Sequence, residues 1–289
     1  MRKRNLALVL GLLVSSKFAI SADILTATPA THILTSSLVE ETSLDVKYLL
    51  PARYGVQRLE SWLSSKGKDS LYQEAQKATA MVTLKSIWPQ DTSFNHARHA
   101  NIRLIQIDAS QSLSHHGGSV AALTNSQGDV SIYSWMNPTN LSRMSKIIAD
   151  DLVAIWPEHA EQIQANLQTN LIKLRQLTQN QSQILFDKQV ESAILLSESL
   201  EDFAAGYQLF VEDRLYQPEI DWTPDTYREL KRKLAQDPSL FIITDRKISH
   251  ELGDQIAAER ILQVDSLERM GRLTFNNKSP FQRWANFSR

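Results

Sequence analysis

The sequence of 289 residues contains no cysteine. This absence excludes disulfides, thiolate metal ligands, a cysteine nucleophile and a lipid-modified N-terminal cysteine. Glycine is also scarce, with nine residues, and no glycine-rich phosphate-binding loop or nucleophile-elbow motif occurs. No spacing of a nucleophile and a base stands out either, so we expect a protein that is not an enzyme.

The chain also lacks an excess of charge of either sign. Lys and Arg total 31 and Asp and Glu total 32, which gives a net charge of −1 and no basic surface for nucleic acid. Beyond the N-terminal segment, no run reaches the roughly 18 apolar residues that a membrane-spanning helix needs. We therefore expect neither nucleic-acid binding nor membrane insertion. A hydrophobic content of 42% still suffices for a folded core.

The N-terminal 22 residues have the pattern of a secretory signal peptide. Arg2, Lys3 and Arg4 supply the positive charge, and the apolar run 6–14 is too short to span a bilayer. Small residues at 19–22 predict cleavage after Ser21 or Ala22. Together with the lack of a lipid-modifiable cysteine, this pattern predicts a soluble protein exported to the periplasm.

Strand-like and helical stretches alternate in both halves of the chain. This alternation predicts an α/β fold with two lobes, each built on a mainly parallel sheet flanked by helices. We expect strands at 23–28, 44–50, 81–84, 102–107, 193–196, 208–211, 241–244 and 261–264, and helices at 29–41, 56–78, 198–205, 224–236 and 250–259.

The middle of the chain predicts two consecutive helices. Asn137-Pro138 begins the first, with Asn as N-cap and Pro at the first helical position. The second, at 158–186, would be roughly 43 Å long and would join the lobes rigidly. We expect a signal peptide at 1–22, an N-terminal lobe at 23–155, a connecting helix at 156–189 and a C-terminal lobe at 190–289. The predicted apolar face of the long helix comprises Ile163, Leu167, Leu171, Leu174 and Leu177, and Phe281, Trp284 and Phe287 predict a short helix at the tail.

Five short motifs occur in a recognisable order. They are Leu49-Leu50-Pro51, Tyr133-Ser134-Trp135-Met136-Asn137-Pro138, Phe203-Ala204-Ala205-Gly206-Tyr207, Ile243-Thr244-Asp245 and Val264-Asp265-Ser266-Leu267. With these motifs, the chain resembles the periplasmic zinc- and manganese-binding proteins of ABC metal-uptake systems, the ZnuA-like group, in which the second motif reads H-V-W-L-D-P.

The resemblance implies a monomeric solute-binding protein that delivers a metal ion to an ABC permease in the inner membrane. Members of the group hold the ion between the lobes with three His, or two His and a carboxylate, plus one further carboxylate. Neither zinc nor manganese is expected to be required for folding.

The family's ligand positions are mostly replaced in this chain. Gln57 or Val56 stands where the first His is expected, Tyr133 where the second is, and Ser197, next to Glu198, where the third is. Only the last carboxylate persists, as Asp265. Phenol and hydroxyl groups are poor ligands for divalent metals compared with imidazole. We therefore expect zinc or manganese to bind weakly at this site.

Other histidines offer weaker candidates. His115 and His116 lie in a polar loop, where they are either a remnant of a metal-collecting segment or simply exposed. His96 and His99 could share a helix face, and His32 lies in the first helix. Two functions remain open: a solute-binding protein with a degenerate metal site and weak or altered ligand binding, and a ligand-free interaction or scaffold protein that has kept the fold.

Overall fold

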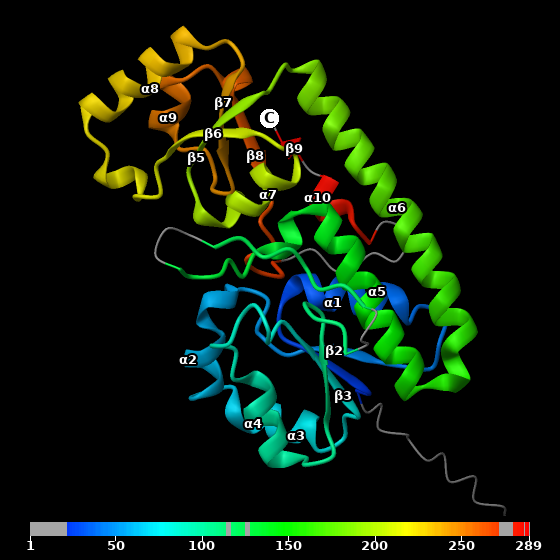
Figure 1. Cartoon of the computed structure of the whole chain (residues 1–289). Coiled ribbons are helices and arrows are strands. Elements are labelled where there is room, and N and C mark those ends of the chain that lie inside the picture. Colours follow the sequence, from blue (N-terminus) through cyan, green and yellow to red (C-terminus); the bar gives the residue numbers. More distant parts are fainter. Residues whose placement is uncertain (1–21, 114–116, 125–127, 272–279, 286, 289) are drawn as a thin grey trace, which may run out of the picture.

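Two parallel sheets form the centres of two lobes in a computed structural model of the chain (Figure 1). The structure describes residues 22–113, 117–124, 128–271, 280–285 and 287–288. The first sheet has the order β2-β1-β3-β4, and all its neighbouring strands are parallel. Its strands are β1 (Ile24–Thr26), β2 (Val46–Tyr48), β3 (Ala80–Thr83) and β4 (Ile105–Asp108).

Four helices accompany the first sheet. The prediction of a single helix at 56–78 is wrong, because the helix is interrupted at Ser64–Gly67. There the hydroxyls of Ser64 and Ser65 bond back to the carbonyls of Glu60 and Ser61, which competes with continuation of the helix. Gly67 also packs so closely on the ring of Trp62 that a Cβ would overlap it. The helices are α1 (Pro29–Leu38), α2 (Leu59–Leu63), α3 (Lys68–Ala75) and α4 (Ser93–Ala100), and the 3-10 turn η1 (Val56–Arg58) precedes α2.

The second sheet has the order β6-β5-β7-β8-β9, in which only the pairing of β8 with β9 is antiparallel. The tail differs from expectation, because Phe287 extends a strand instead of continuing a helix. The strands are β5 (Ser192–Leu195), β6 (Phe210–Arg214), β7 (Leu240–Thr244), β8 (Ile261–Val264) and β9 (Phe287–Ser288). The helices are α7 (Glu201–Gly206), α8 (Pro224–Gln236), α9 (His250–Gln255) and α10 (Gln282–Ala285), with 3-10 turns η4 (Glu198–Leu200), η5 (Glu219–Asp221) and η6 (Ala258–Arg260).

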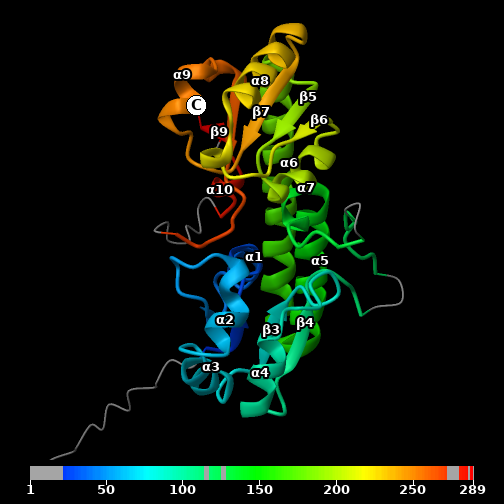
Figure 2. The same ribbon diagram turned by 90° about the vertical axis from the view of Figure 1, so that its left-hand side faces the viewer.

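The two consecutive helices that the sequence predicts in the middle of the chain are present. After the short turn η2 (Ser134–Met136), α5 (Pro138–Ile155) begins where the Asn137 side chain accepts the Thr139 N–H at 3.0 Å. A turn at η3 (Pro157–His159) leads into α6 (Ala160–Asp187), a helix of 28 residues. Figures 1 and 2 both show α6 running alongside the two lobes. None of the described helices is long and apolar enough to span a membrane.

The second sheet packs on different partners at its two faces. Ala193, Leu195, Phe241 and Ile243 join the core that continues into the first lobe and along α6. Ile194, Leu196, Leu240 and Ile242 join a separate core with α8 and α9. The strand ends of β5 and β7 therefore present neighbouring residues to opposite sides of the sheet, as strand geometry requires.

Four of the five apolar positions predicted on α6 are buried: Ile163, Leu167, Leu174 and Leu177. The fifth, Leu171, is only half-buried. We expect Leu174→Ala to lower the free energy of unfolding by about 2–5 kcal/mol, because truncation of a buried leucine leaves a cavity. Exposed Gln168 is the matched control, and Gln168→Ala should change the free energy of unfolding by less than roughly 0.5 kcal/mol. Equal losses in urea denaturation would show that the packing face of α6 is wrong.

A buried carboxyl group lies where α7 meets the start of α5. A Cβ at Gly206 would lie 2.8 Å from Cδ of Pro138, so the two helices are in close contact. Asp202 is 0% exposed, and neither of its carboxylate oxygens has a hydrogen-bond partner among the described residues. Burial raises the pKa of Asp202 to about 6. The nearby Ser131 hydroxyl lowers this pKa, although its geometry is not that of a hydrogen bond. Asp202 is therefore costly to ionise.

This buried acid predicts a pH-dependent stability. Its pKa lies above the unfolded value, so the folded state holds the extra proton, and stability is lost as the pH rises from about 4 to about 6. The loss should be about 3 kcal/mol, at 1.36 kcal/mol per pKa unit. Asp202→Asn should remove that slope and leave the variant more stable than wild type at pH 7.5. Urea denaturation at pH 4 and 7.5 tests this, with exposed Asp150→Asn as control. A change in stability between pH 4 and pH 7.5 that is the same in Asp202→Asn as in wild type would contradict it.

Candidate functional site

The segment that follows β8 crosses from the second lobe to the first. We call residues 265–271 the interlobe strap, and Figure 1 shows the chain descending from β8 toward the first lobe. Val56 donates its N–H to the Glu268 carbonyl at 2.8 Å, and Gly271 donates to the Ala52 carbonyl at 2.8 Å. The strap thus pairs with residues 52–56 of the first lobe.

Tyr133 lies at the centre of this contact. Its hydroxyl donates to Oε2 of Glu268 at 2.8 Å and accepts from Nε2 of Gln57 at 3.1 Å. Gln57 belongs to η1, Tyr133 precedes η2, and Glu268 belongs to the strap. Two positions at which the resemblance expects imidazoles therefore lie together, but as hydrogen-bond partners of each other and of Glu268.

Burial keeps the Tyr133 phenol protonated. Burial raises the pKa of Tyr133 well above its usual range, and the nearby carboxylate of Glu268 raises it further. The phenol therefore stays protonated and serves as a donor, not as a phenolate ligand. Burial also raises the pKa of Glu268, whereas the hydrogen bond from Tyr133 lowers it. The charge of Asp245 raises the pKa of both Tyr133 and Glu268, which places Asp245 near them.

Gly55 provides the space for the Glu268 side chain. A Cβ at this position would overlap the carboxylate and lie 3.1 Å from its Cδ. Glu268 therefore packs directly on the backbone of the loop that follows β2. No sequence motif marks Glu268, and its place three positions after Asp265 is the one signal that points to it.

Asp265, the carboxylate that the resemblance retains, is engaged elsewhere. Its oxygens accept two hydrogen bonds from the Arg283 guanidinium, at 2.7 and 2.8 Å, and one from the Leu267 N–H at 2.9 Å. Arg283 also donates to the Met270 carbonyl at 3.2 Å. Arg283 of α10 therefore holds both ends of the strap, and three of the acceptor sites of Asp265 are occupied by hydrogen bonds within the protein.

The third replaced position belongs to a separate hydrogen-bonded chain. Oγ of Ser197 lies 2.8 Å from Oγ of Ser199, which donates to Asp245 at 2.7 Å. Glu198, beside Ser197, is exposed. The structure thus joins Gln57, Tyr133 and Glu268 directly, whereas Ser197 is linked to Asp245.

The histidines add no ligand set to the described part of the chain. His115 and His116 lie outside the described residues. His96 lies 3.8 Å from Glu60, and His99 is exposed on the same helix. His32 is held by Thr26 at 3.1 Å, and burial lowers its pKa to about 4. Within the described ranges, no three His, Cys, Asp or Glu side chains come together in a way that could hold a metal ion.

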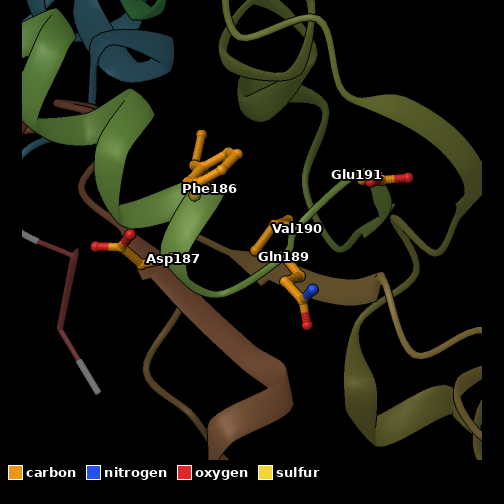
Figure 3. A pocket seen from close by; sticks show the side chains of 6 residues that line it. Phe186, Asp187, Gln189, Val190 and Glu191 are labelled. Carbon is orange, nitrogen blue, oxygen red and sulfur yellow. The ribbon is translucent and has the colours of Figure 1, made fainter.

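A concavity of about 420 Å³ lies away from this site, where α6 ends and β5 begins. Figure 3 shows Asp187 and Glu191 on opposite sides of Val190, with Phe186 on the last turn of the helix. Its polar groups do not converge on one point. The interlobe contact remains the better candidate for a functional site.

The two sheets, the connecting helix and the interlobe position of the site define the class of metal-type solute-binding proteins. A family model described as "Zinc-uptake complex component A periplasmic" (ZnuA) matches residues 54–279. This match spans more than half of the chain, so the chain belongs to that family.

Solved structures agree on the fold. The crystal structure of ZnuA shares 20% identity, with 86% of this chain and 92% of that chain covered and a TM-score of 0.62. The Zn(II)-bound ZnuA-like domain of Streptococcus pneumoniae AdcA shares 16% identity, with coverage of 92% and 100% and a TM-score of 0.67. FpvC of Pseudomonas aeruginosa, solved with Ni²⁺, shares 11% identity, with coverage of 92% and 93% and a TM-score of 0.66. No curated protein sequence matches the chain.

The space at Gly55 yields a test of the interlobe contact. Gly55→Ala should displace Glu268 and break its hydrogen bond with Tyr133, at a cost of about 1–3 kcal/mol in the free energy of unfolding. The loss should disappear when Glu268→Ala is already present, because the two substitutions then remove the same contact.

Gly118→Ala is the matched control, since an added Cβ there meets nothing within 4 Å. Chemical denaturation of the four members of the double-mutant cycle and of this control measures the effect. A loss from Gly55→Ala that persists in full beside Glu268→Ala would contradict the packing described above.

Proposed function

We propose that this chain is an exported, non-enzymatic solute-binding component of an ABC uptake system, whose interlobe site has lost most of its zinc chemistry. Family membership supports the metal-type solute-binding role, the periplasmic location and an inner-membrane permease as partner. The proposal adds that zinc or manganese binds weakly, as cargo, and is not needed for folding.

The hydrogen bonds of Tyr133 are the observation that carries the proposal. The groups that meet there are an amide, a phenol and a carboxylate, and they bond to one another. Zinc prefers imidazole and thiolate ligands, and each 1.4 kcal/mol of lost ligand energy weakens binding tenfold. We therefore expect a zinc affinity in the micromolar range or weaker.

The interlobe strap favours a second candidate, a ligand-free interaction or scaffold protein. In the bound state of a solute-binding protein, the ligand itself bridges the lobes. Here protein groups do so, through Glu268, Tyr133 and the backbone pairing of the strap. A chain that never binds a small solute would keep such a closed form without cost.

Restoring imidazoles tests the proposal. Gln57→His combined with Tyr133→His would place two imidazoles beside the Glu268 carboxylate, since the present side chains already touch. We expect this double variant to bind zinc at least a hundredfold more tightly than wild type in calorimetry. Adding Glu268→Gln should cancel much of the gain, because an amide is a weaker zinc ligand than a carboxylate.

The control places the same two imidazoles on separate elements, as Gln76→His with Gln168→His, both at exposed positions. This control should bind zinc no better than wild type. Tight binding by wild type would refute the loss of zinc chemistry. No gain in the double variant would show that the site geometry has diverged as well, and would favour the scaffold candidate.

A further inference from the structure

A second cavity, of about 430 Å³, opens in the C-terminal lobe away from the interlobe strap. It lies at the carboxyl ends of β5 and β7, where Leu196 and Thr244 form part of its wall. In the order β6-β5-β7-β8, the chain passes from β5 to β6 on one side and then to β7 on the other, so the topological switch point lies between β5 and β7. In open parallel sheets, the crevice at such a reversal is the usual place for a ligand.

The cavity and the interlobe site lie on opposite faces of the second sheet, at the same strand ends. Leu196 belongs to the core of α8 and α9, while Leu195 and Ile243 belong to the core that faces the first lobe. The next residues, Ser197 and Asp245, form the hydrogen-bonded chain near the interlobe site. Leu196 and Thr244 thus face a separate space, to which the interlobe ligand positions do not contribute.

The wall of this cavity is mainly apolar. Leu196, Trp222, Ile248 and Leu252 supply its hydrophobic surface. At the rim, Ile220 is 91% exposed, an unusual position for a large aliphatic side chain. Trp222 is held in place, because its Nε1 donates to the Gln217 carbonyl at 3.3 Å and its ring packs edge-on against Tyr227. A cavity of this size and character suits an apolar body of a few carbon atoms.

Two cations and one carboxylate complete the wall. Lys247 is exposed and makes no ion pair within the described ranges. Arg246 donates to the carbonyls of Tyr216 and Gln217, at 3.3 and 3.5 Å, and keeps further donors. Glu219 accepts hydrogen bonds from the hydroxyls of Tyr227 and Ser249. Both bonds reach Oε1 of Glu219, so neutral donors hold this acid in place and neither cation pairs with it.

We propose that this cavity is a second ligand site, which binds a small amphipathic carboxylate, with its apolar chain along Trp222 and its carboxylate at Lys247 and Arg246. The inference is independent of the interlobe site. A charge-assisted hydrogen bond fixes the head group, and the apolar wall supplies the remaining affinity.

Calorimetry and fluorescence with 8-bromooctanoate test the proposal, because bromine quenches a tryptophan that it contacts. We expect 1:1 binding, together with quenching that is lost in Trp222→Phe. Lys247→Gln should weaken binding about tenfold, the effect of losing one charge-assisted hydrogen bond. Lys146→Gln, an exposed lysine on α5, is the matched control and should leave the affinity unchanged. Octan-1-ol should bind at least tenfold more weakly than octanoate.

Several results would overturn the proposal. They are the absence of saturable binding, equal affinities for octanoate and octan-1-ol, quenching that persists in Trp222→Phe, and equal effects of the two lysine substitutions. Zinc titrations of the same proteins should be unaffected by Lys247→Gln, so failure here leaves the proposed function intact.

Discussion

The ion pair between Asp265 and Arg283 is the constraint on which the interlobe contact depends. It secures the start of the strap to α10, and Arg283 also holds the far end through the Met270 carbonyl. The fixed strap in turn places Glu268 against Gly55 and within hydrogen-bond reach of Tyr133. The carboxylate that the resemblance marks as a metal ligand thus serves here to shape a loop.

The fold could be predicted from the sequence because strand and helix periodicities are local. The alternation of strands and helices and the long α6 follow from patterns of a few residues. The strand at Phe287 could not be predicted, because its pairing with β8 involves residues that are distant in the sequence. The break before α3 was missed although its cause, Gly67 packed against the ring of Trp62, is local. For the site, the motifs led to Gln57 and Tyr133. Glu268 and the Arg283 pairing were missed, since neither carries a motif and both depend on how the strap crosses between lobes.

The strand ends of the second sheet carry polar side chains on one face and mainly apolar ones on the other. Toward the first lobe they present hydroxyls and a carboxylate, at Ser199 and Asp245. Toward α8 and α9 they present apolar groups, with Arg246 and Lys247 at the rim. Neighbouring residues at one strand end thus lie in different environments, because successive side chains of a strand point to opposite faces of the sheet. A substitution at one of these surfaces therefore leaves the side chains of the other in place.

The continuous α6 restricts how the two lobes can move. The helix has 28 residues and neither Gly nor Pro, the residues at which helices usually kink. Bending it would disrupt its own hydrogen bonds. Parting the lobes would also cost the hydrogen bonds that the strap makes with Val56, Ala52 and Tyr133, so the fold opposes separation at two places that are far apart in the sequence.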